Sequence, residues 1–131
     1  MSKKEIKAGD TYTAAEEVDK YRAIFYAGAS GDFNPIHIDP EFGEMVGLGG
    51  VILHGLCTLG FVAKSITDWT EDPGAMKKLS CRFASPVHLG DTVTTEGKVV
   101  GVEDGRAKLE LSVKTQEGVE VLTMTSAEVE V

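Results

Sequence analysis

The sequence has little cysteine, and its cysteines are poorly placed for cross-links. Only Cys57 and Cys81 occur among 131 residues, in apolar surroundings and without a Cys-x-x-Cys motif. This count excludes a disulfide framework and matches no recognised metal-ligand spacing. We therefore expect two buried thiols in a reducing compartment.

Positive charge is also scarce. Thirteen lysines and arginines face 21 aspartates and glutamates, which gives a formal net charge of -8. A chain without a broad basic surface is poorly suited to displace the counterions of a nucleic acid or an anionic membrane. We expect neither as a partner. Any anionic ligand would need a local cluster of cations, for which Lys77, Lys78 and Arg82 are candidates, although a solvated strand face explains them equally well.

No apolar run is long enough to cross a membrane. The most hydrophobic stretch, Val51 to Ala63, is shorter than the roughly 20 residues that a spanning helix needs, and it contains His54. The first residues, Met1 to Glu5, lack the apolar core of a signal peptide. Linkers, repeats and low-complexity tracts are also missing. The sequence therefore predicts a single cytoplasmic domain over residues 1-131, large enough to form a hydrophobic core.

The first half of the chain predicts mostly helices. A short strand is expected at Thr11 to Thr13, followed by a helix over Ala15 to Ala29 and a short helix over Glu41 to Val46. Residues 51-63 are apolar on almost every side, which is typical of a helix in the middle of a fold. We expect its buried part to run from Gly55 to about Ile66. The apolar face of the first helix is expected to comprise Val18, Tyr21, Ile24 or Phe25, and Gly28.

The second half alternates with a period of two residues, which predicts strands with one wet face. Asp104-Gly105 and Glu117-Gly118 have the composition of hairpin turns. One buried helix and at least four long antiparallel strands predict an α+β fold, with a curved antiparallel sheet wrapped around a buried central helix. The alternating inward positions are Ala107, Leu109, Leu111 and Val113, and then Val119, Val121, Thr123, Thr125, Ala127, Val129 and Val131.

A turn-forming segment between the first two helices carries an aspartate and a histidine. In a helix, Asp32 and His37 would lie about 500° apart around the axis and would not share a face. Gly31, Asn34 and Pro35 instead predict an ordered turn, which can bring the carboxylate and the imidazole together around one water. Taken alone, such a pair is more often a turn residue and a structural histidine than a catalytic pair.

The segment just after this turn predicts the start of the short helix. Asp39 is expected as its N-cap and Pro40 at its first position. The turn would then end on a rigid element.

Three segments resemble the MaoC-like dehydratases, the (R)-specific enoyl-thioester hydratases of the hot-dog fold. Tyr26 to Asp39 is similar to the family's hydratase-2 motif. Ile52 to Leu56 is similar to the start of its central helix, and Phe83 to Asp91 to its F-x-x-P-V-x-x-G-D turn. The resemblance extends over about residues 9-131.

The resemblance implies roles for individual residues. It makes Asp32 and His37 the catalytic pair that holds the water, and the backbone N-H of Gly55 the donor to the thioester oxygen. Asn34 would support the loop. One departure is Ala63, where some members have a serine near the acyl site, so the acyl preference stays open.

The implied activity is the reversible hydration of trans-2-enoyl-CoA to (3R)-hydroxyacyl-CoA, a hydro-lyase reaction without cofactor or metal. Dehydration of (3R)-hydroxyacyl-acyl-carrier protein is the nearest alternative, and a thioesterase of the same fold is another. A non-catalytic acyl-thioester-binding subunit is a third, although such a protein would not need Asp32 and His37. A homodimer is expected, because an open sheet leaves an edge strand to cover.

The remaining candidates are expected to be structural. His54 would close the turn into the central helix, His88 would lie at the surface, and Trp69 would lie in the core or at an interface. A metal site formed by His37, Asp39 and His54 is conceivable from ligand type, but no recognised spacing supports it.

Overall fold

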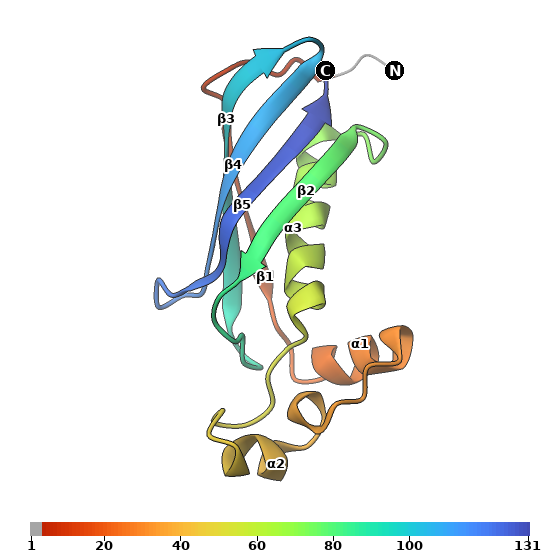
Figure 1. The fold of residues 1–131 in the computed structure, drawn as a ribbon, viewed down its shortest axis with the longest axis vertical. Coiled ribbons are helices and arrows are strands. Elements are labelled where there is room, and N and C mark those ends of the chain that lie inside the picture. Colours follow the sequence, from red (N-terminus) through yellow and green to blue (C-terminus); the bar gives the residue numbers. More distant parts are fainter. Residues whose placement is uncertain (1–3) are drawn as a thin grey trace.

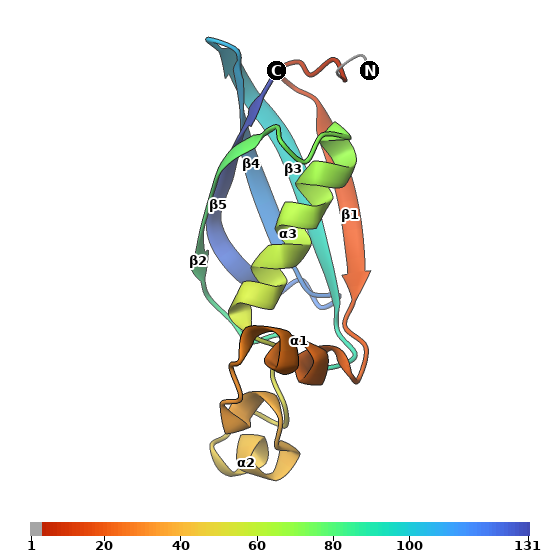
Figure 2. The same cartoon turned by 90° about the vertical axis from the view of Figure 1, so that its right-hand side faces the viewer.

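The computed structural model describes residues 4-131 as a curved five-stranded antiparallel sheet with one long helix against its concave face (Figures 1 and 2). The strand order is β1-β3-β4-β5-β2, so β1 and β2 form the edges. This arrangement confirms the predicted α+β fold. The strands are β1 (Thr11–Glu17), β2 (Met76–Phe83), β3 (Thr92–Glu103), β4 (Arg106–Lys114) and β5 (Glu120–Glu130), and the helices are α1 (Arg22–Ser30), a 3-10 turn (Pro35–His37), α2 (Pro40–Met45) and α3 (Gly55–Thr70).

Buried and exposed residues alternate along β4, as the sequence predicts. On β4, Ala107, Leu109 and Val113 are buried, while the intervening Lys108 and Glu110 are exposed. The β3-β4 hairpin turns at Asp104 and Gly105, both with positive φ, as the two-residue turn favoured by strand twist requires.

The predicted alternation of the last strand is wrong in two places. Val119, expected to point inward, lies before β5 and is exposed. The second place is within β5. Val121 and Leu122 are both buried, and Met124 has a φ of 50°. The pairing with β4 shifts register at this point, between the pair Leu111 with Thr125 and the pair Val113 with Leu122. A bulge therefore turns two successive side chains inward, beside the N-terminal end of α3.

The first helix differs from its prediction. Ala15 and its neighbours continue β1 and pair with β3, and α1 begins only at Arg22. The Asp19 carboxylate accepts the backbone N-H of Tyr21, which stabilises a turn between strand and helix. The small residues Ala23 and Ala27 are buried, whereas Tyr21, Ile24 and Phe25 are more than half exposed.

The short helices lie beyond the N-terminal end of α3, at one end of the sheet (Figure 2). The predicted cap of α2 is confirmed, because the Asp39 carboxylate accepts the N-H groups of Glu41 and Phe42 at 3.0 and 3.4 Å. The segment after α1 is therefore held between two helices. Among residues 4-131, no helix combines the length and hydrophobicity needed to span a bilayer.

The two cysteines are free thiols with different environments. Cys57 on α3 is buried as predicted, but Cys81 is only half-buried because it lies on the edge strand β2. Burial raises the pKa of both thiols, which lowers the thiolate fraction of each.

Tyr12 attaches α3 to the β1 edge of the sheet. Its hydroxyl is hydrogen-bonded to the Ser65 hydroxyl at 2.9 Å, and its ring stacks on Trp69 with centroids 4.9 Å apart. Trp69 is partly buried against the core, so its predicted place is confirmed. Gly97 lies directly opposite Tyr12 on β3, and a β-carbon at Gly97 would overlap the Tyr12 ring.

We predict that Gly97→Ala destabilises the protein by about 1 to 3 kcal/mol, because the added methyl group must displace the Tyr12 ring from α3. Chemical denaturation measures the loss. Gly101→Ala is the matched control on the same strand, since a β-carbon there meets no described atom within 4 Å. Equal stability of the two variants would contradict the role of Tyr12.

Candidate active site

The loop between α1 and the 3-10 turn is held by its own polar groups. Gly31 ends α1 with a φ of 79°. The Ser30 hydroxyl accepts the N-H of Asp32 at 3.1 Å, and the Asp32 carboxylate accepts the N-H of Asn34 at 3.2 Å. The Asn34 side chain in turn accepts the N-H of Ile36 at 3.2 Å. Asn34 therefore lies where a loop-supporting residue is expected.

The loop brings together the aspartate and histidine that the sequence singled out. Asp32 Oδ2 lies 3.9 Å from His37 Nε2, too far for a good hydrogen bond. Two groups that share one water are typically roughly 4 to 5 Å apart, because each lies about 2.8 Å from the water oxygen. The carboxylate is half exposed and the imidazole is buried, so such a water would lie at the wall of a cavity.

The orientation of His37 follows from its other nitrogen. His37 Nδ1 lies 2.8 Å from the carbonyl oxygen of Ile52. A carbonyl can only accept, so Nδ1 carries the proton and donates. In the neutral ring, Nε2 then presents its lone pair toward Asp32 and can accept a proton from a water.

His54 connects this loop to the start of α3. Its Nε2 donates to the backbone carbonyl of Asp32 at 2.9 Å. Its ring stacks on His37 with centroids 3.8 Å apart and packs against Tyr26 at 4.6 Å. The sequence predicted a structural residue at the turn into the helix. The structure adds that the hydrogen bond from His54 to the Asp32 carbonyl fixes the position of the loop relative to α3. No sequence spacing indicates this contact.

Three potential metal ligands meet here, although not the three considered from the sequence. Donor atoms of Asp32, His37 and His54 lie within 4.8 Å of one another, whereas the Asp39 carboxylate is used to cap α2. The two imidazole planes differ by only 18° and are stacked. Their in-plane lone pairs therefore do not converge on one ion, and the arrangement suits a hydrogen-bonded water better than a metal.

Gly55 opens α3 beside this pair. Its N-H has no hydrogen-bond partner within residues 4-131, as expected for the first position of a helix. A β-carbon at Gly55 would lie 2.8 Å from the Phe83 ring. Only glycine therefore allows Phe83 to cover the α-carbon while the N-H stays accessible.

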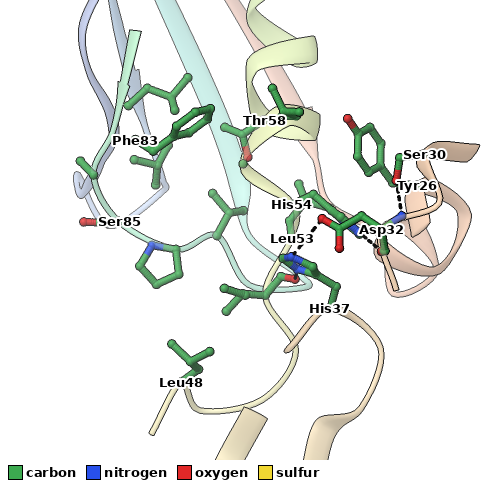
Figure 3. A pocket seen from close by; sticks show the side chains of 18 residues that line it. Tyr26, Ser30, Asp32, His37, Leu48, Leu53, His54, Thr58, Phe83 and Ser85 are labelled. Carbon is green, nitrogen blue, oxygen red and sulfur yellow. Dashed lines mark hydrogen bonds and ion pairs between the residues drawn. The ribbon is translucent and has the colours of Figure 1, made fainter. Parts of the chain in front are cut away.

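A cavity of about 650 Å³ joins these groups (Figure 3). Asp32, His37 and His54 form one wall, and the first turn of α3 and the end of β2 form others. Ala63 is not among its lining residues, so the departure noted in the sequence lies outside this cavity. Most of the lining is apolar and includes Leu48, Ile52, Leu53, Leu56, Phe83, Ala84, Pro86, Val87, Val121 and Leu122.

His88 is not at the surface, contrary to the sequence-based expectation. It is half-buried, and its Nε2 donates to the Leu48 carbonyl at 2.6 Å. The Asp91 carboxylate accepts its backbone N-H at 2.9 Å. The turn after β2 is thus bonded to the segment before α3, and His88 holds the backbone of Leu48, which lines the cavity.

The candidate cations do not form a basic cluster. Lys77 forms an ion pair with Glu130 at 3.7 Å, and Lys78 with Glu128 at 3.8 Å. Arg82 is exposed on the same strand. No lysine or arginine lines the cavity formed by the described residues.

The comparisons with known proteins agree with this architecture. Residues 3-121 match the MaoC like domain, and the chain belongs to that family. It superposes on the (R)-hydratase from A. caviae, described as involved in PHA biosynthesis, with a TM-score of 0.87 at 26% identity, covering 96% of this chain and 97% of that one. The hot-dog fold expected from the resemblance is confirmed.

Sequence relatives carry hydratase names. Over 83 residues the chain is 46% identical to "Enoyl-CoA hydratase 2, peroxisomal" of Arabidopsis thaliana, which covers 62% of this chain. Over 99 residues it is 30% identical to "(R)-specific enoyl-CoA hydratase" of Rhodospirillum rubrum, covering 75% of this chain and 69% of that protein. The matched part is only 26% of the Arabidopsis protein, so this chain spans a fraction of that relative's length.

We predict opposite tautomers for the two stacked histidines. His37 should carry its proton on Nδ1 and His54 on Nε2, because each of these nitrogens faces a carbonyl oxygen. Long-range proton-nitrogen NMR correlations, recorded at a pH where both rings are neutral, distinguish the two forms. The same tautomer at both rings would contradict the site geometry.

Proposed function

We propose that the protein is an (R)-specific enoyl-CoA hydratase, which also catalyses the reverse dehydration of (3R)-hydroxyacyl-CoA. The observation that carries this proposal is the pairing of Asp32 with His37 across a 3.9 Å gap, beside the accessible N-H of Gly55 in one apolar cavity. Family membership and the names of the relatives support it.

Gly55 polarises the substrate in this proposal. Addition of water to C3 of a trans-2-enoyl thioester drives negative charge onto the thioester oxygen. The N-H of Gly55 lies at the positive end of the α3 dipole and can donate to that oxygen. One donor of this kind is typically worth about a hundredfold or more in rate.

Asp32 and His37 activate the water. The Asp32 carboxylate takes a proton from the water as its oxygen bonds to C3, while His37 Nε2 accepts a hydrogen bond from the same water. The electrons of the C2=C3 bond move toward the thioester oxygen, and C2 then receives a proton through the same pair. Dehydration runs these steps backwards, and neither direction calls for a cofactor.

The carrier of the acyl group is proposed to be coenzyme A. An acidic carrier protein would need a basic docking face on this acidic chain. Two of the three cations considered for that role, Lys77 and Lys78, already form ion pairs with glutamates. A thioesterase would not need a water held between Asp32 and His37 next to C3, and a pure binding subunit would need neither residue.

We predict that Asp32→Asn and His37→Gln each lower kcat for crotonyl-CoA hydration by at least about 10²-fold, because each removes a group that handles the water proton. Loss of the conjugated thioester absorbance measures the rate, and chiral analysis of the product should show the (3R) form.

Asp68→Asn is the control for loss of one carboxylate, since Asp68 is exposed on α3 and forms an ion pair with Lys64. We expect it to retain activity. Equal rates in wild type, Asp32→Asn and His37→Gln would exclude the proposed mechanism.

We also propose a homodimer formed through the β2 edge. Among residues 4-131, β2 pairs with β5 alone, which leaves its outer backbone groups without a strand partner there. Leu56 and Phe83 lie near the end of this strand and are 63% and 54% exposed. A second copy placed along β2 would cover both and would close the cavity on that side.

Size-exclusion chromatography with light scattering should therefore give a mass of twice 14.0 kDa. We expect the dimer to be stable because the β2 edge and the apolar side chains of Leu56 and Phe83 lose contact with water in it. A monomer at every accessible concentration would rule the dimer out.

A further inference from the structure

Thr58 carries a hydroxyl that faces the cavity and that the protein itself does not use. The residue lies on α3, lines the cavity and is only 2% exposed. Its hydroxyl makes no hydrogen bond to any residue between 4 and 131. The other hydroxyl residues of α3 behave differently, since Ser65, Thr67 and Thr70 each donate to the carbonyl three residues earlier.

Donation to a carbonyl of the helix, the arrangement of the other three hydroxyls, would have used this group within the protein. Thr58 lines the cavity, and its oxygen is directed along α3 toward the start of the helix (Figure 3). This hydroxyl is therefore oriented toward whatever fills the cavity.

The position of Thr58 on the helix indicates which atom of a ligand it meets. Residues three apart lie on the same face of a helix, so Thr58 lies on the same face as Gly55, one turn further on. Helical side chains lean toward the N-terminus, so the Thr58 hydroxyl is directed back toward the N-H of Gly55.

We propose that Thr58 is a second catalytic donor, whose hydroxyl binds the same thioester oxygen as the N-H of Gly55. This inference rests on the proposed hydratase activity and adds a group to it. As the water oxygen bonds to C3, the C2=C3 electron pair forms the C1=C2 bond of an enolate and the C1=O pair moves onto oxygen. Gly55 and Thr58 then each donate one hydrogen bond to that anion, and no proton leaves either group.

The decisive comparison uses two variants of one side chain. Thr58→Val keeps the shape and removes the hydroxyl, whereas Thr58→Ser keeps the hydroxyl. We expect Thr58→Val to lower kcat for crotonyl-CoA about 10²-fold with little change in KM, because the enolate needs the donor more than the bound substrate does. Thr58→Ser should stay within about tenfold of wild type.

Stability separates this role from a structural one. Thr58→Val breaks no hydrogen bond within the protein, so its melting temperature should equal or exceed that of wild type. Thr70→Val is the matched control, because the Thr70 hydroxyl is used within the protein. That variant should melt earlier and keep its activity.

Binding of acetoacetyl-CoA tests the donor without turnover. Its enolate absorbs in the near ultraviolet, and an oxygen site with two donors should raise the bound enolate fraction in wild type and Thr58→Ser but less in Thr58→Val. A wild-type protein that hydrates crotonyl-CoA, with Thr58→Val equal to it in kcat, would overturn the role of Thr58 and leave the hydratase proposal intact.

The converse result is equally informative. A wild type that fails to hydrate crotonyl-CoA, but loses bound enolate on Thr58→Val, would overturn the hydratase proposal and support the two-donor site. Failure in both assays would overturn both. An effect of Thr58→Val only on acyl chains that carry a polar substituent would assign the hydroxyl to chain selection and would also overturn the proposal.

Discussion

A helix enclosed by a sheet cannot satisfy the N-H groups of its first turn from within, and the start of α3 is organised around this constraint. At Gly55 the unsatisfied N-H opens into an apolar cavity, because glycine leaves room for the Phe83 ring beside its α-carbon. A polar group without a partner in an apolar wall favours a ligand that brings an acceptor. The mostly apolar lining then favours an acyl chain attached to that acceptor.

Asp32 and His37 lie on a segment separate from α3, and His54 connects this segment to the start of the helix. Its ring donates to the carbonyl of Asp32 and stacks on His37, while its backbone forms the cap position of α3. One residue thus relates the water pair to the helix start across 22 positions of sequence. The loop's internal hydrogen bonds fix its shape, and this contact fixes its place relative to Gly55.

Much of this arrangement could be predicted from the sequence, and the failures have physical causes. Period-two alternation located the strands, and Gly31, Asn34, Pro35 and Asp39 specified the turn and the cap. The first helix was wrongly extended back to Ala15, because its apolar spacing begins at Val18 and does not show that the preceding residues pair with β3. The β5 bulge and the burial of His88 depend on contacts with distant segments. The single domain over residues 1-131 and the cytoplasmic location stay predictions.

Thr58 shows that a site can include a residue that no sequence motif singles out. In the sequence it is one more residue of an almost apolar helix, and nothing in its spacing distinguishes it from the other hydroxyl residues of α3. Only the hydrogen-bond pattern separates it, because three hydroxyls donate to their own helix and one does not. Donors on α3 and a water pair on the loop would hold the two ends of the reacting enoyl group from different elements. Their relative position, set through His54, then determines whether the water lies over C3 when the oxygen lies at Gly55.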